Sequence, residues 1–310
     1  MTQQLLLSGF EQPPASNSSH PGFDRRRTDR QRADHCYPEA LIDDSNQVSR
    51  DTPLVSIFTL GRFSLLLNGK PAEFGRKAPK RSLEMLKAIV AQGGREISTI
   101  SLMSALWPEV DGDTAQRSFD TTLHRLRKML GDSRVLVLKD GRLSLDSRYC
   151  WVDVWSFERL LGQSNRLLIG DYTGKQIFSV GCMTDNLTNL YLDHFLAKEE
   201  LTSWSVSMHE RLRSKFIHHL VEVGRYLEKH GFYERAMRCY RKGISVDDLV
   251  EVFYQRLMAC CLETGYQSEG LAAYRSCCQV LSVTLGLQPE PETEALYRAL
   301  KASRLEQQSA

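Results

Sequence analysis

The stretch SFDTTLHRLRKMLG, Ser118–Gly131, carries side chains that could bind a nucleic acid. If residues 115–130 form a helix, intervals of about 100° per residue gather the apolar side chains on one side. That apolar face comprises Ala115, Phe119, Leu123, Leu126 and Leu130. The opposite side, named the basic face below, comprises Arg117, Thr121, His124, Arg125 and Lys128. Such cations and hydroxyls can donate hydrogen bonds to phosphates and to the O6 and N7 atoms of guanine.

Two interpretations of this helix are open from periodicity alone. A helix in the major groove of DNA needs apolar anchors behind and long donors in front, but a solvated surface helix also has a polar face. Arg127 falls between the two faces, at about 40° from Leu123 on the same count. We therefore assign Arg127 either to a phosphate contact or to an intramolecular pair.

The segments around this helix favour the nucleic-acid interpretation. Residues 135–145 read as two short strands around Asp140-Gly141, which predicts a hairpin with Lys139 and Arg142 at its tip. A helix, a loop, a second helix and then a basic hairpin follow the order of a winged helix, whose hairpin lies beside the minor groove. Before the first helix, a basic run could hold a phosphate at the helix N-terminus, although solvation would also explain it. That run comprises Arg76, Lys77, Lys80 and Arg81.

The rest of the N-terminal domain is predicted from turn and cap residues. VSIFTL and FSLLL, closed by Asn68-Gly69, predict a small antiparallel sheet. A first helix follows Pro79 and stops at Gly93-Gly94. Ser98 or Thr99 can cap a second helix that ends at Pro108, and Asp113 or Thr114 can cap the third, which ends at Gly131.

The second half of the chain is predicted to be helical and contains an internal sequence repeat, called the 34-residue echo below. Five pairs of similar residues lie 34 positions apart, which is the period of tetratricopeptide (TPR) repeats. The pairs are Gly231 and Gly265, Phe232 and Tyr266, Met237 and Leu271, Tyr240 and Tyr274, and Val246 and Val280. In such repeats aromatic side chains insert between small residues, here Ala236 and Gly270. The expected organisation is a disordered tail (1–51), a winged-helix domain (52–153), a TPR-like helical domain (154–303) and a short tail (304–310).

Composition limits the class of protein. No apolar run reaches the roughly 18 residues of a membrane span, and the start lacks a signal peptide, so a cytoplasmic location is expected, nucleoid-associated when DNA is bound. The net charge is only +2, so DNA binding must depend on where charges point. The basic run Asp24–Arg32 could touch phosphates, but its interleaved aspartates also suit a solvated linker. The eight cysteines have no C-x-x-C spacing, which suits buried thiols better than zinc or disulfides.

No catalytic or cofactor site is predicted. The segment GDYTGKQ from Gly170 has one residue too few between its glycines for a phosphate loop, and Gln176 stands where Ser or Thr would bind magnesium. The histidines lack further ligands at metal spacing, and no nucleophile–base pair is recognisable. We therefore expect a protein that is not an enzyme and needs no cofactor or metal.

With these elements placed, the sequence resembles bacterial regulators that join an OmpR/PhoB-type winged helix to a bacterial transcriptional activator domain, as in the streptomyces antibiotic regulatory protein (SARP) family. The likeness spans roughly residues 54–300. Its motifs are LGRFSLLLNGK, LMSALWPEVDGDTAQRSFDTTLHRLRKMLG, GRLSLDSRYCWVDVWSFERLL, Trp204 with MHERLRSKF, and AAYRSCCQVLSVTLGLQPEPETEALYRAL. The chain departs from the pattern at Leu143, where the wing strand of the family commonly has Tyr.

The resemblance implies a sequence-specific transcriptional activator that binds double-stranded promoter DNA. Residues 115–130 would enter the major groove, and residues 157–302 would mediate self-association into a homodimer and contact with RNA polymerase. No membrane partner is expected. Two alternatives are kept: a TPR-type adaptor whose winged helix only packs, and a repressor of the same fold, because the fold does not determine the sign of regulation.

Overall fold

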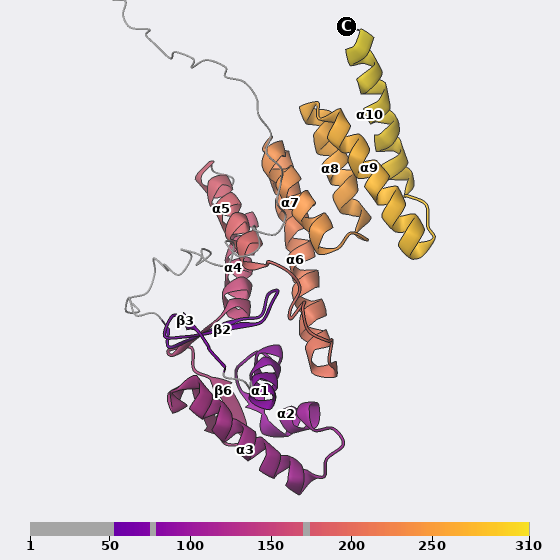
Figure 1. The fold of residues 1–310 in the computed structure, drawn as a ribbon. Coiled ribbons are helices and arrows are strands. Elements are labelled where there is room, and N and C mark those ends of the chain that lie inside the picture. Colours follow the sequence, from indigo (N-terminus) through magenta and orange to yellow (C-terminus); the bar gives the residue numbers. More distant parts are fainter. Residues whose placement is uncertain (1–52, 75–78, 170–173, 310) are drawn as a thin grey trace, which may run out of the picture. The chain divides into compact units, whose positions relative to one another are not determined.

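A computed structural model describes residues 53–74, 79–169 and 174–309 (Figure 1). These residues all belong to one compact unit, Ile42–Ala310. The predicted disordered tail with its basic run Asp24–Arg32 lies outside the described residues, and so do Arg76 and Lys77. Of the predicted basic run, the structure describes Lys80 and Arg81, which are the first two residues of the first helix.

The strands of the N-terminal part form two small sheets. One contains, in spatial order, β3 (Lys70–Pro71), β2 (Ser64–Leu67), β1 (Val55–Phe58) and β7 (Cys150–Val152), and the other contains β4 (Ile97–Ser98), β6 (Arg142–Leu145) and β5 (Leu136–Lys139). The pairs β1–β2 and β2–β3 are antiparallel as predicted, and the Asn68-Gly69 turn joins β2 to β3. However, β7 pairs with β1 in parallel. The predicted small antiparallel sheet is thus present, and β7 is an additional strand that was not predicted.

Three helices follow in the predicted order (Figure 1). They are α1 (Lys80–Ala91), α2 (Thr99–Leu106) and α3 (Gly112–Leu130). Ser98 is the N-cap of α2, and Gly131 ends α3 with a φ of 79°, a left-handed conformation that glycine adopts without strain. The predicted start of α3 is wrong by two or three residues, because Asp111 rather than Asp113 or Thr114 is its N-cap. Asp111 precedes the proposed caps, and its side chain accepts the free backbone N–H of Thr114 in the first turn of the helix.

The hairpin after α3 forms as predicted. A 3-10 turn (Ser133–Val135) leads into β5, and Asp140 and Gly141 connect β5 to β6 with positive φ angles of 48° and 70°. These angles are those of the tight turn that best matches the twist of a hairpin. Leu143 is fully buried in β6, opposite Leu138 and Ile97. A leucine at this position therefore leaves β6 well packed.

The second part of the chain is helical. Its elements are α4 (Asp153–Leu168), α5 (Gly174–Leu190), α6 (Ser203–Lys229), α7 (Tyr233–Val246), α8 (Glu251–Thr264), α9 (Gln267–Val280), a π-helical turn (Leu281–Leu285) and α10 (Pro291–Ser309). The 34-residue echo is confirmed, since α7 and α9 begin and end 34 positions apart. α10 continues through Ser309, into the short tail that was predicted from residue 304.

Helix packing in this part depends on small residues facing large side chains. A Cβ atom added at Gly224 would lie 2.3 Å from the ring of Tyr240, and one added at Gly243 would lie 2.4 Å from the ring of Phe253. These glycines let α6 approach α7, and α7 approach α8, more closely than any larger residue would allow. Aromatic rings thus pack against small residues, as predicted, at Gly224 and Gly243. Of the two small residues named from the sequence, Gly270 faces Leu300 and not an aromatic ring.

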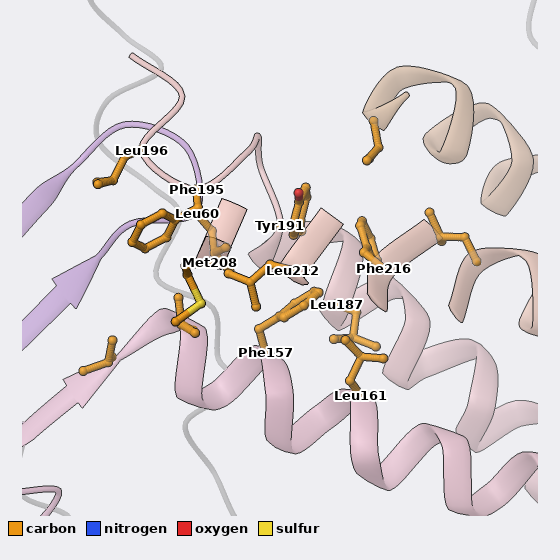
Figure 2. Packing of buried hydrophobic residues seen from close by; sticks show 14 of the residues in the cluster. Leu60, Phe157, Leu161, Leu187, Tyr191, Phe195, Leu196, Met208, Leu212 and Phe216 are labelled. Atoms are coloured by element: carbon orange, nitrogen blue, oxygen red, sulfur yellow. The ribbon is translucent and has the colours of Figure 1, made fainter. Parts of the chain in front are cut away.

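A connecting segment, residues 191–202, links α5 to α6 and contacts the turn after β1. The N–H of Leu196 donates to the carbonyl of Thr59 at 2.8 Å, and the N–H of Gly61 donates to the carbonyl of His194 at 3.0 Å. Figure 2 shows the apolar cluster at this junction, with side chains from the β1 turn, the connecting segment, α4, α5 and α6. Its labelled members are Leu60, Phe157, Leu161, Leu187, Tyr191, Phe195, Leu196, Met208, Leu212 and Phe216.

A buried carboxylate lies at the same junction. Asp153, the first residue of α4, accepts hydrogen bonds from the N–H of Leu60 at 2.6 Å, from the Thr59 hydroxyl at 2.8 Å and from the Thr59 N–H. Burial raises the pKa of the Asp153 carboxyl, and these hydrogen bonds oppose the rise. The end of β1 and the start of α4 are thereby held together through one side chain.

The described cysteines are free, and most are buried. Burial raises the pKa of Cys150, Cys239 and Cys261 to about 12, so these side chains remain thiols at neutral pH. Cys36 lies outside the described residues. Within the described part of the chain, no helix combines the length and the hydropathy needed to cross a membrane.

Candidate nucleic-acid interface

The predicted division of α3 into two faces agrees with the burial of its side chains. The apolar face is buried throughout, with Phe119 at 1% and Leu126 at 0% exposure. All five residues of the basic face are exposed. Asp120, which precedes Thr121 in the sequence, accepts a hydrogen bond from Gln116 at 3.1 Å. The basic face is therefore free to meet a large anionic surface.

The N-terminus of α3 adds a residue that sequence reasoning treated only as a cap. Asp111 Oδ1 accepts the backbone N–H of Thr114 at 3.1 Å, and hydrogen bonds from Thr114 hold the pKa of Asp111 below its ordinary value. Thr114 is thus inside the helix and exposed. Its position is about 180° from Leu123, which places it on the basic face. Asp113 and Thr114 are cap residue types as well, so the sequence alone does not select Asp111.

Arg127 differs from the residues of the basic face because it is half-buried. Its Nη2 donates to the carbonyl of Leu136, at the start of β5, at 3.0 Å. Its Nε is buried and has no hydrogen-bond partner among the described residues. Of the two assignments that periodicity left open for Arg127, the structure contains the intramolecular one.

The tip of the hairpin presents its two cations differently. Lys139 and Arg142 are both exposed and stand opposite each other across the turn. Arg142 Nη1 donates to the carbonyl of Glu96, beside β4, at 3.1 Å, which ties β6 to the segment before α2. Val137 and Leu138 on β5 are 43% and 41% exposed. Both tip cations are therefore exposed, and Arg142 also holds the hairpin in place.

The first turn of α1 supplies the two remaining cations of the predicted set. Lys80 is exposed. Arg81 forms an ion pair with Glu84 at 2.9 Å while its side chain stays 67% exposed. Such exposed pairs contribute little to stability and are screened by salt, so Glu84 does not prevent Arg81 from contacting a phosphate.

The base of the hairpin carries a cluster that sequence reasoning missed. The tripeptide Asp-Ser-Arg occurs on both sides of the hairpin, and in each copy the Arg forms an ion pair with its own Asp at 2.7 Å. The guanidinium carbons of Arg134 and Arg148 lie 4.6 Å and 5.5 Å from the ring centre of Tyr149. Hydrogen bonds from Arg134 and from Arg148 lower the pKa of Asp132 and of Asp146 respectively. The repeated tripeptide was the available signal. Each ion pair is local to its own copy, and the two copies meet at the ring of Tyr149.

The arrangement suits binding of a polyanion, with exposed donors on one helix face and at one hairpin tip. Among the described residues, no group of three or more His, Cys, Asp or Glu side chains is placed to hold a metal ion. The rejected phosphate-loop candidate, Gly170–Gln176, lies partly outside the described residues.

The helical part of the chain matches a known family of domains. Residues 152–301 match the family model described as "Bacterial transcriptional activator domain". The second half of this chain matches a bacterial activator domain. No curated protein matches the chain. The activator-domain match begins at Val152, the last residue of β7, one residue before α4.

A solved structure extends the comparison beyond the activator domain. The structure "Mycobacterium tuberculosis EmbR in complex with low affinity phosphopeptide" has a TM-score of 0.59 and 18% sequence identity, and the match covers 82% of this chain and 69% of that chain. At this identity the likeness concerns the fold. Because 82% of the chain is more than residues 152–301 supply, the likeness in fold includes residues outside the activator domain.

Proposed function

We propose that this protein is a sequence-specific DNA-binding transcriptional regulator, and that it activates transcription. The observation that carries the proposal is the exposed basic face of α3, next to a hairpin with Lys139 at its tip. In this proposal residues 52–153 are a winged-helix domain: α3 enters the major groove, and the hairpin lies along the backbone or in the minor groove. The match of residues 152–301 to an activator domain supports the regulatory role.

The helical domain is proposed to mediate self-association and contact with RNA polymerase. Its TPR-like helix hairpins support a role in binding protein, because stacked helical repeats present extended surfaces to partners. The connecting segment and Asp153 link this domain to the turn after β1. A partner bound to the helical domain would then be held near the promoter.

The direct test is binding to promoter DNA over a range of salt concentrations. Fragments from upstream of the chain's own gene and its neighbours are the probes, and a coding fragment of equal length is the control. If about five cations release counterions, log K should fall with log salt at a slope of about −4 to −5. The fragments should separate into bound and unbound sets at physiological salt. An affinity that does not change with salt concentration, or equal binding to every fragment, would contradict the proposal.

Single substitutions should then separate base contacts from backbone contacts. Arg117→Ala or Arg125→Ala should weaken specific binding by about 1–3 kcal/mol and relax sequence preference, if the side chain contacts a base edge. Lys139→Ala should weaken all sequences alike and reduce the salt slope by about 1. The measurement is a titration of each variant against matched and mismatched operators. Wild-type binding by all three variants would exclude α3 and the hairpin as the DNA-binding surface.

The two alternatives have different outcomes in the same experiments. An adaptor would fail to bind any promoter fragment while its helical domain still captured a partner protein. A repressor would bind DNA as proposed but would lower transcription from the bound promoter in a reporter assay. The fold does not distinguish activation from repression, so the reporter assay decides the sign.

A further inference from the structure

Arg127 joins the candidate recognition helix to the wing. It lies on α3, and its Nη2 donates to the carbonyl of Leu136, the first residue of β5, at 3.0 Å. Leu136 is 1% exposed, so the bond is made at the base of the hairpin and away from its tip. Because Arg127 is half-buried between the two faces of α3, its guanidinium points to the hairpin rather than belonging to the basic face.

The Leu136 carbonyl needs a donor from outside the sheet. Lys139 and Arg142 close the two-residue turn, so this pair exchanges backbone hydrogen bonds. Along an antiparallel ladder such pairs alternate with pairs whose backbone N–H and C=O groups point away from the partner strand. The pair Leu136–Leu145 lies three positions from Lys139–Arg142, so its backbone groups point away from the partner strand. The N–H of Leu145 agrees with this, since it donates to the carbonyl of Gly94 on the far side at 2.8 Å. On the near side β5 is the last strand of its sheet, and Arg127 supplies the bond that a further strand would have made.

The energetics of this contact favour a role in position over a role in stability. A half-buried guanidinium with one neutral acceptor gains little after its desolvation. Its buried Nε, without a partner among the described residues, adds a further penalty. A methionine of similar length would lose the bond but would also remove that penalty. Stability should therefore change little, whereas the angle between hairpin and helix would lose one of its constraints.

We propose that Arg127 is a positioning residue that holds the wing at the angle to α3 at which Lys139 reaches the DNA backbone. The inference rests on the proposed function, since it concerns how two DNA-contacting elements are held together. In this role Arg127 touches no DNA, and it acts through Lys139. Arg142, bonded to the carbonyl of Glu96 at the other edge of the sheet, provides the opposite constraint on the hairpin.

A double-mutant cycle tests this role in the full-length chain. The four proteins are the wild type, Arg127→Met, Lys139→Ala and the double variant, titrated against one operator at several salt concentrations. Each single change should weaken binding about tenfold, the effect of losing one charged hydrogen bond, and should lower the salt slope by about 1. The affinity of the double variant should be no lower than that of the weaker-binding single variant, because without Arg127 the contact of Lys139 with DNA is already lost. Multiplied losses would overturn the proposal.

Two further variants separate position from charge and from folding. Lys128→Met removes a neighbouring cation on the exposed basic face of α3, and its effect should multiply with that of Lys139→Ala. Arg127→Lys keeps the charge but loses the planar fork, so it should stay weakened; full recovery would assign the effect to charge and overturn the proposal. Each variant should melt close to the wild type. If Arg127→Met unfolds, the cycle is run with Arg127→Lys.

The outcomes also separate this inference from the proposed function. If Lys139→Ala binds every DNA as the wild type does, the proposed contact of the wing with DNA fails. If Lys139→Ala is weakened but the losses in the cycle multiply, the wing contact stands and only the role of Arg127 falls.

Discussion

Phe119→Ala is expected to unfold the N-terminal domain or to lower its free energy of unfolding by about 3–5 kcal/mol, the usual loss for a large buried ring. The ring is 1% exposed and lies on the buried face of α3, which packs against α1. Removing it leaves a cavity that a close-packed interior fills only in part. Chemical denaturation followed by tryptophan fluorescence measures the change, with Trp107 at the end of α2 as a reporter inside the domain.

The matched control is Thr121→Ala, two residues further along α3 on the exposed basic face. Its free energy of unfolding should stay within about 0.5 kcal/mol of the wild type, because exposed substitutions rarely cost more. Its affinity for an operator should nevertheless fall if the basic face binds DNA. The pair of variants therefore tests the two faces of one helix separately. A wild-type stability for Phe119→Ala would show that α3 does not anchor the domain through this face.

The two faces of α3 could be predicted because they follow from local geometry alone. A period of 3.6 residues decides which side chains share a face, and the packing of the domain then buries the apolar one. The same holds for the hairpin, where Asp140-Gly141 is a turn signal contained in two residues. The 34-residue echo is local in the same sense, since each repeat carries its own aromatic and small residues.

The features that were missed depend on pairing between distant residues. Strands β4 and β7 are two and three residues long and have no periodicity of their own, so they exist only because β6 and β1 lie beside them. A parallel pair such as β1–β7 joins segments nearly a hundred positions apart, which no local signal records. The start of α3 was missed for a smaller reason, since Asp111, Asp113 and Thr114 are all good caps and sequence does not rank them.

The candidate site was predictable in its residues and only partly in their roles. Helical periodicity placed Arg127 between the two faces of α3. Its partner, however, is a backbone carbonyl in β5, which is available only because β5 is an edge strand of the folded sheet. Arg142 was expected at the hairpin tip and is there, yet it also bonds to the carbonyl of Glu96. In both cases residue type and spacing gave the location, and the tertiary fold decided how the charge is used.

The stability of the helical domain should fall as pH decreases from about 6.5 towards 4, because His219 is buried in its neutral form. The ring is fully buried, its Nδ1 lies 3.1 Å from Asn165 Oδ1, and its Nε2 has no partner among the described residues. Burial, reinforced by the neighbouring charge of His218, lowers the pKa of His219 from 6.5 to about 4. Protonation would place an unpaired charge on Nε2 inside the core.

The direction follows from comparing the pKa values of the two states. The unfolded chain takes up a proton near pH 6.5 and the folded chain near 4, so the contribution of His219 is complete above 6.5 and is lost as pH falls between these values. A difference of this size corresponds to about 3 kcal/mol over the whole window. Chemical denaturation at pH 7 and at pH 4.5 should reveal most of that loss.

His219→Gln should remove much of this pH dependence, because a glutamine side chain stays neutral and can still donate to Asn165. The matched control is His218→Gln at the adjacent, exposed position, which should keep most of the slope because the buried ring is still present. Burial also lowers the pKa of His209, so some slope should persist in His219→Gln and fall further in the His209→Gln, His219→Gln double variant. A slope in His219→Gln equal to that of the wild type would mean that groups other than this buried ring set the acid stability of the domain.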